Sequence, residues 1–415
     1  MKSILSLVFV FVIAVSAFFP GNGLLQSDDW PQILGPSRNG ESREKLLAAW
    51  PKTGPRQLWK KKCGEGFAGV AVKNDQVILF HRIGAKDIVE CLSAKDGKLI
   101  WKQEFEAVYK GGFSSDLGPR CVPVIYADSV FLYGAGGTLR RLKLRSGEQL
   151  WSRNLFEDFK ANEGYFGAGS TPVVTRDTLV VMVGGRTAGI VGLNWDGETI
   201  WKTEPETASY AAPVELTYRG RKSVACVSKF SVKIVDLGSG KVVLSQDFGA
   251  RGPTVNAAMP LVFDGKLFVS AAYRVGARMI SLPSGKTIWE NDLSMSSQYT
   301  TCVIHEGYLI GCHGREDFGN GALRCVRVTD GKVVWEEPGS GICHVIKAGD
   351  KALVWTIDGA LKLIKIQPSR YELLAEARIF TKNSKSLPAL SNGRLFVKSN
   401  GDEGAGELTC LQVGQ

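Results

Sequence analysis

Residue types that usually carry catalysis or hold metals are scarce in this 415-residue chain. It has four histidines and nine cysteines, and no two cysteines are adjacent or spaced as C-x-x-C. The motifs G-x-S-x-G, H-E-x-x-H and G-x-x-x-x-G-K-[ST] do not occur either. These absences exclude the motif-defined serine hydrolases, zinc proteases and phosphate-loop enzymes.

Charge of one sign is not concentrated anywhere in the sequence. The formal net charge is +10 and the isoelectric point is near 9.1, which favours acidic partners in general. No run of five like charges occurs, however, and the basic residues are scattered. We therefore interpret the charge as a general surface property and predict no nucleic-acid partner.

Long apolar runs are absent after the first twenty residues. Ile4 to Phe19 is almost wholly apolar, follows Lys2 and ends before a proline, and small residues near its end offer a cleavage site. This pattern predicts a signal peptide over residues 1–20 and an exported chain, with an uncleaved anchor as the alternative. The next cysteine is Cys63, so we predict no lipid attachment directly after the signal. We expect no transmembrane span in the mature chain.

The cysteines occur at repeated positions rather than in a disulfide framework. Cys91, Cys325 and Cys410 each precede an apolar residue of the same strand pattern. Equivalent positions lie in different repeat units, too far apart to bridge. We predict mostly free, buried cysteines. The alternative is one or two bridges among Cys302, Cys312, Cys325 and Cys343.

A hexamer with a turn glycine and a terminal Trp recurs along the chain. In register, its copies end at Trp59, Trp101, Trp151, Trp201, Leu244, Trp289, Trp335 and Leu374, so that successive copies lie 39 to 50 residues apart. Between copies, short β-branched or aromatic runs alternate with Asp/Gly or Ser/Gly turns, which predicts four antiparallel strands per unit. Four such strands form a propeller blade, and we predict an all-β propeller.

The two ends of the chain complement each other. Residues 375–415 contain three strand-like runs without a Trp-bearing fourth, and residues 52–59 supply an unaccompanied fourth strand. Pairing them closes the ring and removes exposed sheet edges. We predict eight blades over residues 52–415; seven is the alternative if one degenerate copy is dismissed. Residues 21–51 are expected to form a Pro/Gly-rich strap on the propeller surface.

The repeated Trp is interpreted as a structural element. Its preceding glycine permits the positive φ of a tight turn, and the indole can then pack between neighbouring sheets. A ligand site would not need nearly identical residues in every blade, nor accept Leu in two of them. The six structural Trp positions are Trp59, Trp101, Trp151, Trp201, Trp289 and Trp335.

The hexamer D-G-K-x-x-W, following an apolar strand, resembles the PQQ-like β-propeller repeats. These repeats occur in quinoprotein alcohol dehydrogenases and in the outer-membrane assembly factor BamB, and the resemblance covers residues 52–415. The segment DWPQILGPSRNG, Asp29 to Gly40, is similar to the lead found before many exported bacterial members. The resemblance implies a bacterial envelope protein, but the family includes both enzymes and non-catalytic scaffolds.

Quinoprotein enzymes, which the chain resembles in its repeats, carry a vicinal cysteine pair on the quinone and acidic and Asn ligands for Ca²⁺. The sequence has no adjacent cysteines and no carboxylate cluster with ligand spacing. The pairs Cys312-His313 and Cys343-His344 point to a metal, but adjacent strand residues face opposite sides, so each pair offers one ligand. We predict no cofactor, no metal and no catalytic residue, with PQQ and Ca²⁺ as the alternative.

Only one face of the expected ring carries varied loops. The hexamer turns and the first turn of each unit share one face and are short and repetitive. The opposite face gathers the loops between second and third strands and the connections between blades, and such varied loops usually carry binding. The candidate ligand residues on this face are Arg82, Arg120, Tyr165, Arg186, Tyr210, Asn256, Arg274, Tyr299 and His344.

Together these observations predict a non-catalytic, monomeric propeller in the periplasm or cell envelope. We expect it to act as a scaffold that binds an envelope protein or polymer, broadly like BamB. One alternative is an enzyme, either a PQQ-dependent dehydrogenase or another envelope enzyme. Another is a propeller that binds sugars or anions, which the aromatic and Arg residues of the varied face would suit.

Overall fold

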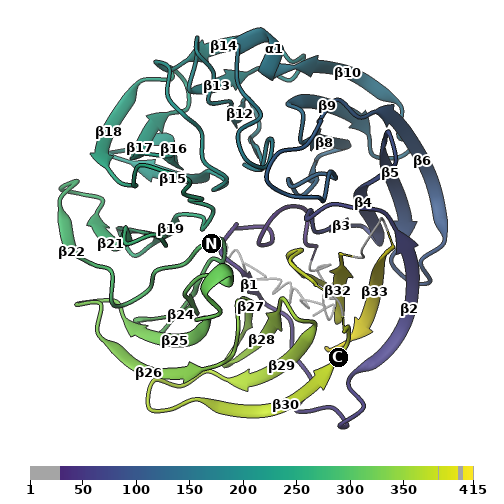
Figure 1. The fold of residues 1–415 in the computed structure, drawn as a ribbon, viewed down its shortest axis with the longest axis vertical. Coiled ribbons are helices and arrows are strands. Elements are labelled where there is room, and N and C mark those ends of the chain that lie inside the picture. The colour runs from purple at the N-terminus through teal and green to yellow at the C-terminus, as the bar shows by residue number, and fades with distance from the viewer. Residues whose placement is uncertain (1–28, 382, 401–404, 415) are drawn as a thin grey trace, which may run out of the picture.

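The chain folds into eight β-sheets arranged as blades around a ring (Figure 1). The computed structural model describes residues 29–381, 383–400 and 405–414, so the predicted signal peptide lies outside the described residues. Every sheet has four antiparallel strands, and one sheet gains a fifth, parallel strand. The all-β, eight-bladed propeller predicted from the sequence is therefore confirmed.

In seven of the eight sheets the four antiparallel strands follow one another along the chain from the centre of the ring outwards, and in the last sheet the outer strand comes from the N-terminal part of the chain. The first four sheets are β3 (Ala71–Lys73), β4 (Gln76–Ile83), β5 (Lys86–Ser93) and β6 (Leu99–Glu106); β7 (Val124–Tyr126), β8 (Ser129–Tyr133), β9 (Thr138–Lys143) and β10 (Gln149–Asn154); β11 (Val173–Val174), β12 (Leu179–Met182), β13 (Ile190–Leu193) and β14 (Thr199–Lys202); and β15 (Val214–Tyr218), β16 (Arg221–Val227), β17 (Ser231–Asp236) and β18 (Val242–Asp247).

The other four sheets repeat this order. They are β19 (Leu261–Phe263), β20 (Lys266–Ala271), β21 (Gly276–Ser281) and β22 (Thr287–Asn291); β23 (Val303–His305), β24 (Tyr308–His313), β25 (Ala322–Arg327) and β26 (Val333–Pro338); β27 (Cys343–Ala348), β28 (Lys351–Thr356), β29 (Ala360–Lys365) and β30 (Glu372–Arg378), with β1 (Glu41–Ser42) added to β27; and β31 (Ala389–Ser391), β32 (Arg394–Ser399), β33 (Gly406–Gln412) and β2 (Arg56–Cys63).

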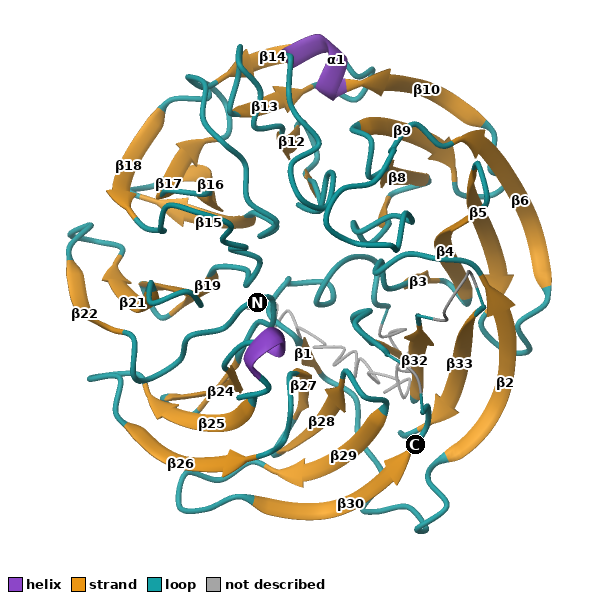
Figure 2. Cartoon of the chain, viewed as in Figure 1, coloured by secondary structure: helices purple, strands orange, loops and turns teal. Residues whose placement is uncertain are grey.

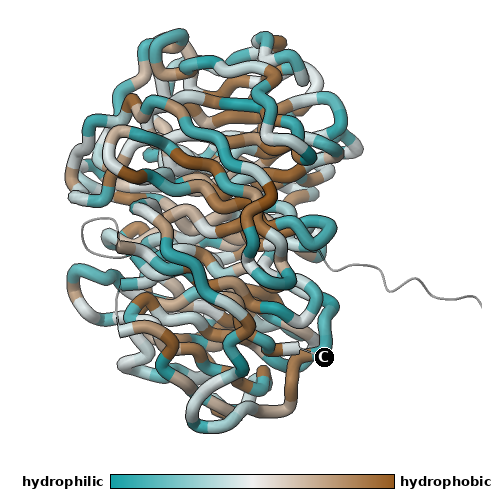
Figure 3. The backbone as a smooth tube through the Cα atoms, turned by 90° about the vertical axis from the view of Figure 1, so that its right-hand side faces the viewer, coloured by the Kyte–Doolittle hydropathy of each residue, from teal (hydrophilic) through white to brown (hydrophobic). Residues whose placement is uncertain are grey.

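Burial follows the position of a strand within its sheet. All five residues of β8 are buried, whereas β6 on the outside alternates between exposed and more buried residues. Inner strands pack against sheets on both sides, so they are apolar throughout, and an outer strand has one face in water. The side view shows apolar strands between more hydrophilic turns (Figure 3). The core therefore lies between adjacent blades.

The ring closes between the two ends of the chain, as predicted. Strand β2 pairs antiparallel with β33 in the last sheet, with Trp59 opposite Cys410. The N-terminal strand thus forms the outer edge of a sheet whose three inner strands end the chain (Figure 2). Closure by hydrogen bonding leaves no open gap between the first and last blades.

Each repeated Trp joins its own sheet to the next. The six indole N–H groups donate to carbonyl oxygens of the following blade over 2.7 to 3.0 Å. For example, Trp101 in β6 bonds to the Leu144 carbonyl beyond β9. A Cβ on Gly147 of that blade would lie 2.5 Å from the Trp101 ring. The turn glycine therefore also makes room for the preceding Trp, and the structural interpretation of the hexamer is confirmed.

Where a hexamer lacks its Trp or its glycine, other side chains form the contact between neighbouring blades. Gly285 faces Leu244 instead of a Trp, at 3.0 Å from its Cδ1 to a built Cβ. Trp335 meets a blade whose hexamer, SRYELL, has no glycine. Its indole still donates to the Gln367 carbonyl, and its ring contacts Tyr371 with centroids 5.9 Å apart.

Part of the described strap enters the centre of the ring, while other strap residues, such as Arg43, are exposed on the surface. Ile33 and Leu34 pack against inner-strand residues of several blades, including Ala212 and Met259. Arg38, only 4% exposed, donates to the carbonyls of Pro172 and Pro213. Removing these apolar side chains from water stabilises the fold, and the ring centre surrounds them on all sides.

Two further features complete the fold. A short helix, α1 (Leu155–Phe159), and a 3₁₀ turn, η1 (Glu316–Phe318), interrupt the connections of this all-β fold. All nine cysteines are free and buried, in agreement with the predicted majority state. Among the described residues, no helix has the length and apolar composition needed to cross a membrane.

Candidate functional site

The antiparallel order of each blade sorts its loops onto two faces. We call the face that carries the β4–β5-type loops and the connections between sheets the connector face. The hexamer turns lie on the other face. Two hollows on the connector face collect most of the candidate ligand residues, and they share Gly169 and Tyr210 in their lining.

The first hollow, the channel-mouth cavity, lies over the centre of the ring and measures about 210 Å³. Seven of the eight connections between sheets contribute to it, all except the one between β26 and β27, and Ile33 of the strap also lines it. The residues from the connections and inner strands include Phe67, Arg120, Phe166, Tyr210, Ala257, Tyr299, His344 and Lys385. Four predicted candidates, Arg120, Tyr210, Tyr299 and His344, are therefore brought together.

A hydrogen-bonded network occupies one side of the channel-mouth cavity. The Lys385 ammonium lies 2.7 Å from the Glu316 carboxylate, which also accepts from the Tyr299 hydroxyl at 2.9 Å. The Nε2 of His344 bonds to the Lys385 carbonyl over 3.0 Å. Burial lowers the pKa of His344 to about 4, so its ring is neutral at neutral pH. Burial and the neighbouring Glu316 raise the pKa of Tyr299.

Arg120 is committed to the structure rather than free for a ligand. Its guanidinium is paired with Asp116 at 2.7 Å and donates to the Gly118 carbonyl. It also lies over the rings of Phe67 and Tyr109, with centroid distances of 4.7 and 5.7 Å. Charge reversal here would bury two like charges together, so Arg120 is unsuitable as a surface probe of binding.

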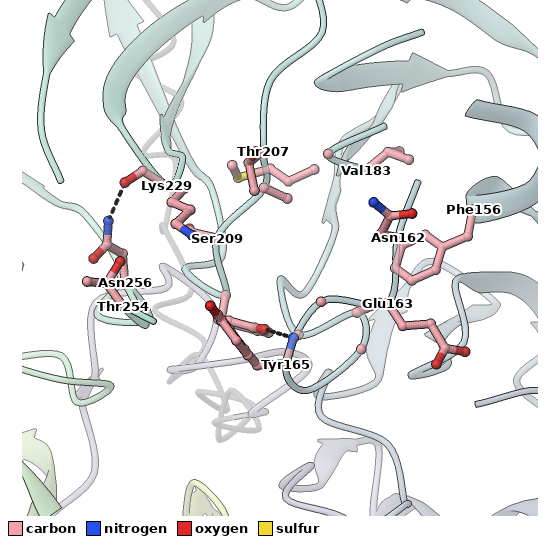
Figure 4. Close-up of a pocket in the computed structure, with 18 residues that line it drawn as sticks. Phe156, Asn162, Glu163, Tyr165, Val183, Thr207, Ser209, Lys229, Thr254 and Asn256 are labelled. Atoms are coloured by element: carbon pink, nitrogen blue, oxygen red, sulfur yellow. Dashed lines mark hydrogen bonds between the residues drawn. The ribbon is translucent and has the colours of Figure 1, made fainter. Parts of the chain in front are cut away.

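The second hollow, the interblade cavity, lies between the third sheet (β11–β14) and the fourth (β15–β18) and measures about 290 Å³ (Figure 4). Three predicted candidates, Tyr165, Tyr210 and Asn256, line it. The Tyr210 hydroxyl accepts from the backbone N–H groups of Tyr165 and Phe166, both at 3.2 Å. Asn256 is 2% exposed and donates to the Ser228 and Lys229 carbonyls.

The remaining three candidates lie apart from these hollows. Arg82 is 8% exposed and donates to the carbonyls of Gly84, Tyr109 and Leu117, so it holds loops in place. Arg274 is exposed and lines a separate shallow hollow. Arg186 is exposed beside α1, where its N–H donates to the Lys160 carbonyl.

Sequence reasoning missed part of the interblade lining. Phe156 reaches the cavity from α1, whose first turn is capped by Asn154. The Asn154 side chain accepts from the Phe156 and Glu157 N–H groups, while its amide donates to Glu157. The spacing N-x-x-E is a capping pattern and could have revealed this helix. Lys229 and Glu163 carry no such signal.

The residues of the channel-mouth cavity do not fit PQQ with Ca²⁺. Its one carboxylate, Glu316, is already neutralised by Lys385 and bonded by Tyr299. No two cysteines are adjacent in the sequence, so a vicinal disulfide cannot form. In the part of the chain that the structure describes, no three His, Cys, Asp or Glu side chains converge as a metal site. We derive no chemistry through this cofactor.

Comparison with known proteins agrees with the geometry. A family model described as the outer membrane protein assembly factor BamB matches residues 42–225. A curated relative, BamB of Burkholderia pseudomallei (strain K96243), is 23% identical over 259 residues, which make up 57% of this chain. The chain is therefore similar to PQQ-like β-propellers, and the family match covers residues 42–225 of its ring. This propeller spans 61% of the length of that curated relative.

Solved structures resemble the propeller over most of its length. BamB from Moraxella catarrhalis has a TM-score of 0.64 at 18% identity, covering 86% of this chain and 100% of that one. A europium-containing methanol dehydrogenase has a TM-score of 0.68 at 11% identity, covering 93% and 98%. Quinohemoprotein alcohol dehydrogenase from Comamonas testosteroni has a TM-score of 0.56 at 14% identity, covering 94% and 81%. These likenesses show the fold alone.

Proposed function

We propose that the PQQ-like propeller is a non-catalytic scaffold that binds a protein partner at the bacterial cell envelope through its connector face. The observation that carries this proposal is the distribution of exposed large apolar side chains. Among the described residues, seven of the thirteen lie on outer strands. The other six all belong to the connector face: Ile83, Val108, Phe113, Phe230, Leu293 and Phe318.

The exposure of these six side chains is large. Phe113 is 75% exposed, Leu293 76% and Phe318 67%. The turns of the opposite face hold none of the exposed large apolar residues within the described ranges. Apolar groups in exposed loops cost solubility without adding to a core, and their gathering on one face is typical of an interaction surface.

Cations flank this apolar surface. The Arg315 guanidinium, which is paired with Asp317, lies over the rings of Tyr273 and Phe318, at 4.1 and 4.2 Å from their centroids. The Lys229 ammonium lies 5.5 Å from the ring centre of Phe230. A partner segment with an acidic side chain beside apolar ones would match this arrangement, because the acidic group would meet Lys229, which has no ion-pair partner among the described residues.

The named relatives support the place of action. The BamB relative is described as an outer membrane protein assembly factor, and the family model carries the same description. An envelope location and a protein partner follow for this propeller by analogy with that description. The predicted signal peptide is consistent with export.

Affinity purification from the native envelope tests the proposal with a matched pair of substitutions. Leu293→Thr changes the connector face, and Ile288→Thr changes an exposed side chain of the same chemistry on the outer strand β22. We expect a co-purifying envelope protein to be lost with Leu293→Thr and with Phe113→Ser, and retained with Ile288→Thr. Equal retention in all three variants would contradict a role for the connector face.

A further inference from the structure

Asn256 lines the interblade cavity with a buried amide that leaves one acceptor without a donor. Its Nδ2 donates to the Ser228 and Lys229 carbonyls at 3.2 and 3.1 Å, and since carbonyls only accept, the orientation of the amide is fixed. Its Oδ1 is buried and has no donor among the described residues. A buried acceptor without a donor costs about 1–3 kcal/mol. A ligand that supplies a hydroxyl or amide hydrogen at this point removes the cost.

Two oppositely charged side chains face the same cavity without an ion-pair partner among the described residues. Glu163 comes from the connection before β11, and Lys229 from the β16–β17 loop. Figure 4 shows them on opposite sides of the hollow. The Lys229 ammonium lies near the rings of Tyr165 and Phe230, at 5.8 and 5.5 Å from their centroids. The lining therefore carries no net charge, yet offers both a strong acceptor and a strong donor.

Aromatic side chains and glycines form the rest of the lining of the interblade cavity. Phe156, Tyr165 and Tyr210 contribute rings. A Cβ on Gly169 would lie 2.5 Å from Tyr210, and one on Gly184 would lie 2.5 Å from the Ala208 nitrogen. Side chains at these two positions are therefore excluded, and the space beside the rings stays open. Burial raises the pKa of the Tyr210 phenol, so its hydroxyl stays protonated and able to donate.

We propose that the interblade cavity binds an uncharged saccharide unit. A sugar ring presents an apolar C–H face, which suits the aromatic rings, and hydroxyls that both donate and accept, which suit Asn256, Glu163 and Lys229. The volume of about 290 Å³ is at the small end of the range of roughly 300–1,000 Å³ for ligand sites, which limits the occupant to one or two rings.

An anion suits the cavity less well. Its single cation, Lys229, is opposed by Glu163 in the same lining. This site lies on the same connector face as the apolar surface of the proposed function, and Lys229 borders both. Its occupant differs from the protein partner proposed there.

Saturation-transfer NMR and calorimetry on the purified full chain test the saccharide site. The probes are glucose, N-acetylglucosamine, a β-1,4-linked N-acetylglucosamine tetramer and inorganic phosphate. We expect saturable binding of at least one neutral saccharide and none of phosphate. Tighter binding of the tetramer than of the monosaccharides would identify a polymer as the source of the unit. Equal affinities would identify a free sugar.

Variants locate the binding. Glu163→Gln and Lys229→Met should each weaken binding roughly ten-fold, the equivalent of one charge-assisted hydrogen bond. The matched controls Glu198→Gln and Lys241→Met, on hexamer turns of the opposite face, should leave affinity unchanged. Asn256→Ala should abolish binding, and the two partly exposed variants keep the test valid if this one misfolds.

Three results would overturn the saccharide site. They are no saturation by any saccharide, stronger binding of phosphate, and unchanged affinity in both the Glu163 and Lys229 variants. The assay uses pure protein and small probes, so it can fail while the envelope purification succeeds, and the reverse.

Discussion

At the scale of single residues, burial on the connector face changes the pKa of His344 from the value that it has in water. His344 is 2% exposed, contacts the Tyr299 ring and bonds to the Lys385 carbonyl, and burial lowers its pKa to about 4. The ordinary value is 6.5. Between these values the unfolded chain binds a proton at this position that the folded chain does not.

This difference makes His344 a source of acid sensitivity. The free energy of unfolding should fall as the pH drops from 6.5 to 4, with a contribution of roughly 3 kcal/mol from this residue. His344→Gln keeps a side-chain donor for the Lys385 carbonyl and removes the titration. We expect urea unfolding at a series of pH values to show a shallower decline in the variant over this interval. Parallel curves for the two proteins would contradict the buried neutral state.

At the scale of elements, the blade joint is a Trp packed on a glycine of the next hexamer turn. Gly147 has φ of +72° and lies against Trp101, whereas Gly220 has φ of +78° with nothing within 4 Å of a built Cβ. The two glycines thus differ in contacts and not in backbone conformation.

Alanine at these two glycines separates the contact from the backbone strain. Both substitutions place a side chain in the left-handed region, at a cost of about 1–2 kcal/mol. Gly147→Ala should cost an additional 1–3 kcal/mol or so because the methyl group meets the indole. Chemical denaturation measures the difference. If Gly220→Ala is as destabilising as Gly147→Ala, the glycine serves only the turn.

The strap is the second element with a specific energetic role. The Arg38 guanidinium satisfies the carbonyls of Pro172 and Pro213 at the centre of the ring, and it also donates to Gln32. Burial lowers the pKa of Arg38 to about 10, so it remains charged at neutral pH.

Loss of this guanidinium should loosen the strap. We expect Arg38→Met to lower the free energy of unfolding by about 2–4 kcal/mol, because two buried carbonyls lose their donor. Arg43→Met, at an exposed position of the same strap, should change it by less than about 0.5 kcal/mol. Thermal or denaturant unfolding compares the two. A similar loss in both variants would show that the strap is held without this contact.

At the scale of the whole molecule, repetition made the fold predictable and left the site largely hidden. The hexamer register predicted eight blades and the closure by β2, because both depend on a pattern repeated in every blade. The interblade cavity depends on what does not repeat: the helix α1, the β16–β17 loop with Lys229, and the amide of Asn256. The sequence placed Tyr165, Tyr210 and Asn256 on this face, but could not show that Arg82 and Arg120 are consumed by internal contacts.

The packing of the eight blades also explains the course of the strap. Its composition of Pro and Gly predicted an irregular segment, and an irregular segment usually lies on a surface. The ring of inner strands instead leaves a central space that side chains of the blades do not fill. Ile33 and Leu34 occupy it, so the packing of eight blades decides where the strap lies.

Site-specific photo-crosslinking in living cells examines the partner-binding face of the whole molecule. A photoreactive residue is placed singly at Phe113 and Phe318 on the connector face, and at Ile200 and Ile288 on the outer strands, all exposed positions. We expect one discrete envelope-protein adduct from the first two positions and none from the other two. Adducts from the outer strands alone, or from none of the four positions, would contradict a scaffold that binds its protein partner through the connector face.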